Sequence, residues 1–191
     1  MIEIDPNEIE VRNIDWGDFP ILMQYFFESP PEYMKSIGLR PPEPGDAEKF
    51  ESFWKTRFDT LENGGAPIPV FTIFYRGERV GFHTSTHHIP NESITMHAHL
   101  VRADLRGKGI GLVSYVLAIE KFFQEFKLAR VIFKTPVQNL APMRIKEKLG
   151  IKPIAEEIID WPALVEPLQT KVFHVTPDQV PKLKRAARIE T

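Results

Sequence analysis

The strongest constraint on this chain is a glycine-rich turn at residues 106–111, which reads Arg-Gly-Lys-Gly-Ile-Gly. The turn follows a segment of strand character at 93–101 and begins a run at 109–126 whose apolar residues recur at helical spacing. Glycines allow backbone amides to approach a ligand closely, and the amino end of a helix carries a partial positive charge. The turn therefore predicts a site for a pyrophosphate, with tight packing without a ligand as the alternative.

Two better-known kinds of glycine-rich phosphate loop fit this turn poorly. A nucleoside triphosphate loop needs Gly-Lys followed by Ser or Thr, whereas here Gly109 follows Lys108. A dinucleotide-binding fold needs an amino-terminal parallel βαβ unit, whereas this turn follows an antiparallel meander expected at 70–75, 79–88 and 93–101. The turn therefore favours a third kind of phosphate-binding fold.

The periodicity of apolar residues along the rest of the chain predicts a mixed α/β fold. Further strands are expected at 9–12, 130–134 and 168–175. Helices are expected at 19–28, 46–61, 109–126 and 141–149. This order of elements predicts one domain, residues 1–191, in which helices flank a mainly antiparallel sheet.

The composition excludes several classes of protein. The chain of 191 residues contains no cysteine, which rules out disulfides, thiolate metal sites and cysteine nucleophiles, so any acyl transfer would be direct. A formal net charge of -2 gives no basic excess for binding nucleic acid or an anionic membrane. The acidic opening at 1–5 and the lack of a long apolar run argue against a signal peptide and a membrane span, so a cytoplasmic protein is expected.

Two motifs resemble those of a known superfamily. Residues 101–111, Val-Arg-Ala-Asp-Leu-Arg-Gly-Lys-Gly-Ile-Gly, are similar to the cofactor motif of the GNAT superfamily of N-acetyltransferases, Gln/Arg-x-x-Gly-x-Gly/Ala after a strand. Residues 139–151, which begin with Asn and end with Glu-Lys-Leu-Gly-Ile, are similar to its second signature. The resemblance implies the GNAT fold, with a twisted and mostly antiparallel central sheet. It also implies transfer of an acetyl or other short acyl group from acyl-CoA to a primary amine.

The resemblance assigns residues to the site of acetyl-CoA, or of another acyl-CoA, as co-substrate. The pyrophosphate would lie on the amides of the three glycines of the turn, where Arg106 and Lys108 add positive charge or, alternatively, form a solvated basic turn. The pantetheine would lie beside the end of the preceding strand and contact Asn139. The cofactor-binding residues implied in this way are Leu100, Val101, Arg106, Gly107, Lys108, Gly109, Ile110, Gly111 and Asn139.

His97 and His99 are the candidate catalytic residues. They lie two residues apart in the strand expected at 93–101, so both side chains point to one face. An imidazole with a pKa near 6.5 can remove a proton from the acceptor ammonium, directly or through water. His97 is favoured, because it lies where serotonin N-acetyltransferase-like members of the superfamily carry a strand histidine. The alternative for both residues is a packed, hydrogen-bonded ring.

No metal site is expected, although other histidines raise that alternative. His83, His87 and His88 lie on the strand before His97 and His99, and imidazole is a common ligand of transition metals. No carboxylate lies at evident ligand spacing on these two strands. A histidine-rich metal site is therefore the weaker interpretation.

The sequence departs from the superfamily at the residue that protonates the leaving CoA thiolate. Many members carry a Tyr seven residues after the signature Asn, and this chain has Lys146 there. Lys146, Tyr115, water or no group at all are the alternatives for that role. The departure leaves open a non-catalytic acyl-CoA-binding module. The residues around Lys146 are more similar to the ribosomal-protein alanine acetyltransferase branch, which makes a protein amino terminus or lysine an alternative acceptor.

The acceptor is expected to be a small-molecule amine, held by the first two helices and the proline-rich connection between them. Phe26, Phe27, Tyr33 and Met34 are candidates for an apolar acceptor pocket, with core packing as the alternative. A groove beside these helices would instead favour a peptide. The sequence leaves the oligomeric state open, with a homodimer among the alternatives.

Overall fold

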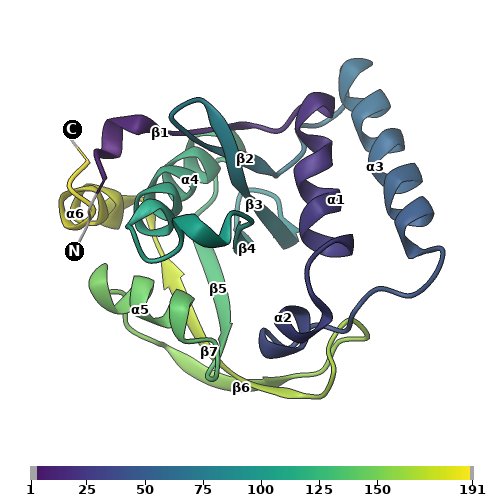
Figure 1. Ribbon diagram of the computed structural model, residues 1–191. Coiled ribbons are helices and arrows are strands. Elements are labelled where there is room, and N and C mark those ends of the chain that lie inside the picture. The colour runs from purple at the N-terminus through teal and green to yellow at the C-terminus, as the bar shows by residue number, and fades with distance from the viewer. Residues whose placement is uncertain (1–3, 190–191) are drawn as a thin grey trace.

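The computed structural model describes residues 4–189, which form a seven-stranded sheet with helices on both faces (Figure 1). The strands are β1 (Ile9–Asn13), β2 (Phe71–Tyr75), β3 (Glu78–Ile89), β4 (Ser93–Leu100), β5 (Arg130–Pro136), β6 (Ala155–Ile159) and β7 (Leu168–Val175). The α-helices are α1 (Phe19–Phe27), α2 (Pro31–Ser36), α3 (Asp46–Glu62), α4 (Ile110–Phe126), α5 (Leu140–Lys148) and α6 (Val180–Ala186). The strand order is β1-β2-β3-β4-β5-β7-β6. The predicted fold class, a mixed α/β chain with a mainly antiparallel sheet, is confirmed.

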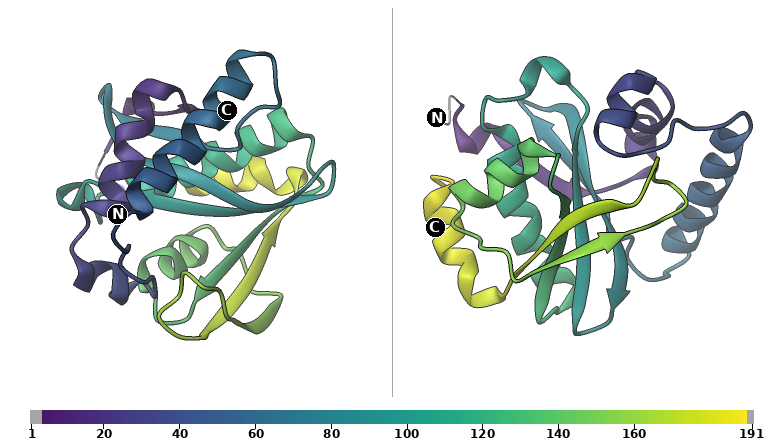
Figure 2. Two further views of the ribbon diagram at one scale, coloured as in Figure 1. Left: turned by 90° about the vertical axis from the view of Figure 1, so that its right-hand side faces the viewer. Right: turned by 90° about the horizontal axis from the view of Figure 1, so that it is seen from below.

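The sheet opens at its centre, because β4 and β5 pair in parallel along only part of their length. Their ladder ends at Thr95. Beyond that point β4 stays paired with β3 through Leu100, and β5 stays paired with β7 through Pro136. The two halves of the sheet therefore part (Figure 2), and residues 96–100 and 133–136 form the two edges of the split.

Alternate side chains of the central strands enter different layers. Ile94 and Met96 of β4 belong to a core that is shared with α4 and α6. Phe82 of β3 belongs to a second core with α1 and α3. Because side chains alternate along a strand, His97 and His99 face the layer of α1 and not that of α4. Figure 2 shows α1 and α3 on one face of the sheet and α4 on the other.

Three short elements are not predicted by apolar periodicity. Helices α2 and α6 span six and seven residues, too few for a helical repeat to stand out. Strand β6 lies at the edge of the sheet, and its Ile158 is 75% exposed, so it lacks a regular buried face. The predicted elements are present, with ends shifted by one or two residues. No helix in residues 4–189 has both the length and the apolar character needed to cross a bilayer.

Candidate active site

The glycine turn connects β4 to α4 through backbone conformations that favour glycine. Gly107 has a φ of +84° and Gly109 a φ of +109°, and Gly109 is the amino-terminal cap of α4. A Cβ atom at Gly107 would meet no heavy atom within 4 Å. The turn therefore brings backbone amides and the amino end of a 17-residue helix next to unfilled space, an arrangement that suits an anion.

A cavity of about 590 Å³ runs from this turn into the split between β4 and β5. Of the residues predicted for the cofactor, it is lined by Leu100, Arg106, Gly107, Gly109, Gly111 and Asn139. The two candidate catalytic residues, His97 and His99, line the same cavity. The fold thus places both sequence motifs and both histidines around one space.

The other three residues predicted for the cofactor have side chains outside the lining of this cavity. Ile110 is fully buried in the core beneath the turn, so any contact it makes with a pyrophosphate would be through its backbone. Val101 packs against the core of α1 and α3, and its amide donates to the carbonyl of Val80 at 2.9 Å. Lys108 is half-buried within the turn. All nine cofactor assignments stay predictions, and the lining of the cavity gives no support to those of Ile110, Val101 and Lys108.

Arg106 ties the glycine turn to β4 and α2. Its Nη2 donates to the carbonyl of Leu100 at 3.1 Å, and its guanidinium lies 4.4 Å above the ring centroid of Tyr33. The side chain is exposed nonetheless, so its charge remains beside the turn. Arg106 therefore has a positioning contact in addition to the charge expected from sequence.

His97 is half-buried and is the first member of a chain of hydrogen bonds. Its Nε2 lies 3.0 Å from Oγ1 of Thr86, and that oxygen lies 3.1 Å from Nδ1 of His87. Thr86 and His87 are exposed. Burial, and then electrostatic interaction with His87 and Lys146, lower the pKa of His97 to about 4. His97 is therefore uncharged at neutral pH and connected to the surface.

His99 has the surroundings of a packed aromatic ring. Its centroid lies 4.6 Å from that of Tyr25 and 4.7 Å from that of Phe82. Its Nε2 lies 3.3 Å from Oγ1 of Thr84, while its Nδ1 is buried without a hydrogen-bond partner. Burial, and then the neighbouring histidines, hold the pKa of His99 well below its usual value. These contacts favour a structural role more strongly for His99 than for His97.

His83 and His88 of β3 lie in surroundings that differ from those of His97 and His99. His83 is fully buried on the α4 side, with its ring centroid 6.4 Å from that of Tyr115, and burial lowers its pKa to about 3. His88 lies 5.4 Å from the ring of Phe126. Within the part of the chain that is described, no three His, Cys, Asp or Glu side chains form a group that could hold a metal ion.

Lys146 lines the cavity with a side chain that is only 2% exposed. Burial lowers its pKa to about 7. Tyr115 of α4 lines the cavity nearby, and its hydroxyl is buried without a hydrogen-bond partner. Burial raises the pKa of Tyr115 well above its usual value. Both residues that the sequence offers for the missing Tyr are therefore at the cavity.

The cavity is largely apolar where it borders α1, α2 and the hairpin of β6 and β7. Its walls there are Tyr25, Tyr33, Ile37, Leu39, Ile159, Trp161, Leu164 and Leu168. No Asp or Glu of residues 4–189 lines the cavity. Trp161, Leu164 and Leu168 are absent from the prediction, because they depend on a hairpin whose first strand has no clear sequence signal. The isolated bridge between Leu39 and Leu164 brings that hairpin against the segment after α2.

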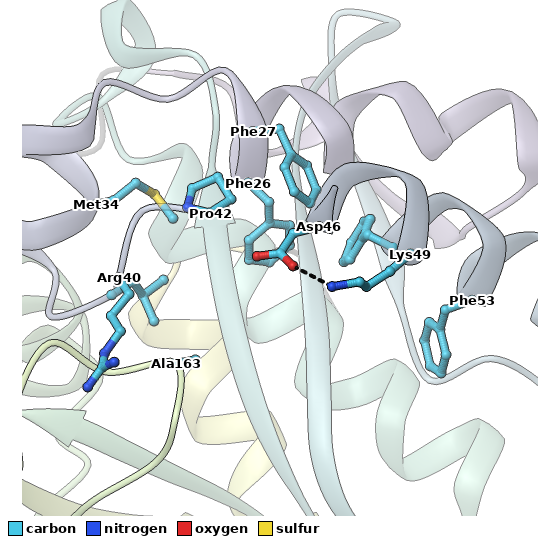
Figure 3. Close-up of a pocket in the computed structure, with 11 residues that line it drawn as sticks. Phe26, Phe27, Met34, Arg40, Pro42, Asp46, Lys49, Phe53 and Ala163 are labelled. Atoms are coloured by element: carbon cyan, nitrogen blue, oxygen red, sulfur yellow. Dashed lines mark hydrogen bonds and ion pairs between the residues drawn. The ribbon is translucent and has the colours of Figure 1, made fainter. Parts of the chain in front are cut away.

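A second hollow of about 410 Å³ lies beside α1, α2 and α3 (Figure 3). It is lined by Phe26, Phe27, Met34, Leu39, Arg40, Pro42, Asp46, Lys49, Phe50, Phe53 and Ala163. Leu39 lines both spaces. Of the four candidates for the acceptor pocket, Tyr33 therefore lines the main cavity and the other three line this second hollow. Met34, at 2% exposed, also belongs to the core.

The central sheet opens beside a glycine turn, and that turn lies at the amino end of a helix. This arrangement agrees with the fold of the GNAT acyltransferases, which the sequence motifs resemble. The family model described as Acetyltransferase (GNAT) domain matches residues 8–152. The chain therefore belongs to the GNAT acetyltransferase family, whose acyl donor is acetyl-CoA. The comparison with curated proteins found no match.

Solved structures with the same fold include enzymes with different acceptors in their names. A spermidine N-acetyltransferase from Vibrio cholerae, in complex with CoA and spermine, is 12% identical with a TM-score of 0.70, covering 92% of this chain and 99% of that one. The ribosomal-protein-S5-alanine acetyltransferase from Vibrio fischeri is 15% identical with a TM-score of 0.68, covering 90% and 94%. A GNAT-family acetyltransferase from Bacillus anthracis is 17% identical with a TM-score of 0.66, covering 90% and 96%. These identities establish a shared fold and leave the acceptor undetermined.

Proposed function

We propose that this protein transfers an acetyl or other short acyl group from acyl-CoA to the primary amine of a small molecule, by direct attack of the amine on the thioester. The observation that carries the proposal is a single cavity that joins the glycine turn to an apolar recess beside α1 and α2. Acyl donor and amine would meet at the split between β4 and β5, beside His97. Membership of the GNAT family supports the donor.

The donor half of the cavity has the groups that CoA requires. The amides of the turn and the amino end of α4 suit the pyrophosphate, and Arg106 adds positive charge beside them. Beyond Thr95, the edge of β4 that faces the split has no strand partner within residues 4–189. Its backbone groups are therefore available for the amides of pantetheine. Asn139, at the cavity wall, can supply a further hydrogen bond.

The acceptor half favours an amine with an apolar body and a single positive charge. Aromatic and aliphatic side chains form its walls, and no carboxylate of the described residues lines the cavity. A second ammonium group would therefore be desolvated without an opposite charge, at a cost of several kcal/mol. We infer an aromatic or aliphatic monoamine as the acceptor, in contrast to the polyamine named for the relative from Vibrio cholerae.

His97 is the proposed first acceptor of the proton that the amine loses. Because burial lowers the pKa of His97 to about 4, the ring holds a proton only weakly. The hydroxyl of Thr86 and the exposed His87 continue from its Nε2. His97 would thus take the proton as nitrogen attacks the thioester and pass it to the surface.

Calorimetric titration with acetyl-CoA and desulfo-CoA tests the donor half. Gly109→Asp places a carboxylate where the pyrophosphate would lie and is expected to abolish binding. Gly64→Asp is the matched control, because Gly64 also has a positive φ, of +80°, and lies outside the cavity. Failure of the wild type to bind either ligand would overturn the proposal.

A panel of amines tests the acceptor half once binding is established. Phenethylamine and hexylamine represent the apolar monoamines, spermidine the polyamines, and a short peptide with amino-terminal alanine the protein acceptors. The proposal expects kcat/KM to be highest for an apolar monoamine. Turnover of spermidine alone would contradict the inferred acceptor. CoA binding without turnover of any amine would indicate a non-catalytic acyl-CoA-binding module.

The second hollow favours one other acceptor, the amino terminus of a protein. It lies beside α1, α2 and α3 and shares Leu39 with the main cavity. Its phenylalanines, of which Phe53 is 54% exposed, offer a surface for apolar side chains that follow the acetylated residue. Phe53→Ser is expected to raise KM for a peptide acceptor and to leave KM for a small amine unchanged. Equal KM values for the peptide in wild type and variant would exclude this alternative.

A further inference from the structure

Lys146 has surroundings that a lysine adopts rarely without a functional reason. The side chain is 2% exposed, and its Nζ points among three aromatic rings from three different elements. Nζ lies 5.0 Å from the ring centroid of Tyr115 on α4, 5.1 Å from that of Phe133 on β5 and 5.4 Å from that of Phe173 on β7. Buried lysines are normally paired with a carboxylate.

No carboxylate of residues 4–189 neutralises this ammonium. Its hydrogen bond is to the carbonyl of Pro142, one turn back on α5, at 3.4 Å. None of the ion pairs within 4.0 Å among residues 4–189 includes Lys146. The three ring faces stabilise a cation, although less than water would. The carbonyl of Pro142 is thus the only hydrogen-bond acceptor of this ammonium within residues 4–189, and Lys146 lines the cavity.

Tyr115 on α4 and His97 on β4 are titratable groups that line the same cavity as Lys146. The pKa of Tyr115 is raised by burial, and that of His97 is lowered, so neither carries a charge at neutral pH. Burial lowers the pKa of Lys146 to about 7, so protonated and neutral forms are both populated there. Of these three groups, only Lys146 can deliver a proton readily at neutral pH.

The other charged side chains that line the cavity are cations, and cations of the neighbouring strands are already paired. On β5, Nζ of Lys134 lies 2.7 Å from Glu157, and on β7, Nζ of Lys171 lies 3.6 Å from Glu156. From the same helix and from the turn, the cavity is also lined by Arg144, Lys148 and Arg106. These positive charges favour a developing anion in the cavity.

We propose that Lys146 protonates the CoA thiolate as it leaves. This inference rests on the proposed acyl transfer. The amine nitrogen forms the new C–N bond, the C–S bond breaks, and its electron pair stays on sulfur. One N–H proton of the Lys146 ammonium moves to that sulfur, which gives CoA thiol and neutral lysine. The lysine recovers a proton from solvent when the products leave, so the enzyme is unchanged after a turnover.

The direction of this proton transfer is favourable. The thiol of cysteine has a pKa of about 8.5, and an alkyl thiol without the neighbouring amide groups is no stronger an acid, so the CoA thiolate accepts a proton downhill from an acid whose pKa is about 7. Tyr115, whose pKa burial raises, would have to donate uphill. A lysine kept in this cage for packing alone would be inferior to an apolar side chain of the same length, because its charge must be desolvated.

The test compares the wild type with Lys146→Met and Lys146→Arg, using CoA as the probe. Met keeps an unbranched chain in the aromatic cage, and Arg keeps a charge that it does not release at neutral pH. The thiol of bound CoA is titrated by the ultraviolet absorbance of its thiolate, a readout that needs no acceptor. Lys152→Met, at an exposed position just after α5 and outside the lining of the cavity, is the matched control.

The expected result is that the bound thiol titrates about one unit lower in Lys146→Arg than in Lys146→Met, because the guanidinium stabilises the thiolate. The wild type should titrate between the two variants, because part of Lys146, whose pKa is about 7, is already neutral where the thiol ionises. The kcat for amine acetylation should fall by about 10²-fold in both Lys146 variants, with CoA affinity nearly unchanged. Lys152→Met should alter neither quantity.

An identical thiol titration in the wild type and Lys146→Met, together with an unchanged kcat, would overturn the role of Lys146 and leave the proposed function intact. A wild type that binds no CoA would overturn both. Retained kcat in Lys146→Arg would also contradict proton donation, because arginine keeps its proton, and would indicate that charge alone is required.

Discussion

An alanine at position 81 would place its Cβ in overlap with the carbonyl oxygen of His99 and 3.1 Å from Cα of Leu100. Gly81 of β3 pairs with Leu100, which is the last residue of β4. The two backbones approach closely there because Gly81 has no side chain. This contact sets the position of the strand edge that we propose for pantetheine.

Gly81→Ala is therefore expected to impair both stability and CoA binding. The overlap is with backbone atoms, which cannot move aside as a flexible side chain would, so the unfolding free energy should fall by about 2 kcal/mol. Displacement of Leu100 should weaken CoA binding by calorimetry. Gly64→Ala, which meets no heavy atom within 4 Å, should lose about 1 kcal/mol through its positive φ and bind CoA normally. Normal CoA affinity in Gly81→Ala would contradict the proposed path of pantetheine.

The donor half of the site could be predicted from sequence because its chemistry is local. Gly107 and Gly109 adopt positive φ angles just before a helix. Both the glycines and the helical pattern that follows them can be recognised within one short segment of the sequence. The second motif places Asn139 at the start of α5 in the same way. A short segment with its own turn and helix signals specifies such a site without knowledge of the rest of the fold.

The acceptor half could not be predicted, because it depends on contacts between distant segments. Leu39 and Leu164 meet only after the hairpin of β6 and β7 folds back over the segment after α2. The burial of Lys146 could not be predicted from the sequence either. In sequence it resembles the neighbouring solvated Arg144 and Lys148, and its aromatic cage comes from α4, β5 and β7. Tertiary packing decides which cation of a helix is buried.

Stability should rise with pH because of Lys146. Its pKa is about 7 in the folded state and 10.5 without the fold, so the unfolded chain binds more protons between these values. Its unfavourable contribution is complete below about pH 7 and is relieved as the pH rises to about 10. Lys146→Met should therefore exceed the wild type by a few kcal/mol in urea unfolding near pH 6, and by little near pH 10. A constant difference across this range would show that Lys146 titrates normally.

Asp18 should be a strong determinant of stability at the start of α1. Its carboxylate is 2% exposed, accepts from Oγ1 of Thr72 at 2.9 Å and is paired with Arg79. Asp18→Ala leaves a buried hydroxyl and a guanidinium without their partner, so a loss of about 3 kcal/mol is expected in urea unfolding. Asp18→Asn should lose less, because its amide oxygen still accepts from Thr72. Glu8→Gln, at the exposed ion pair with Arg76, should change stability by less than about 1 kcal/mol.

The chain of hydrogen bonds from His97 predicts graded effects on catalysis. His97→Ala removes the proposed proton acceptor, so kcat should fall by about 10²-fold with CoA affinity nearly unchanged. Thr86→Val keeps His97 and the shape of residue 86 but removes the hydroxyl that lies 3.0 Å from Nε2 and 3.1 Å from His87. If the proton leaves by this route, kcat should fall by about 10-fold, and Thr86→Ser should restore it.

A full rate in Thr86→Val with a reduced rate in His97→Ala would mean that His97 passes its proton to water. An unaltered rate in His97→Ala would exclude His97 as the base, and the low pKa of about 4 would then reflect packing beside the split in the sheet.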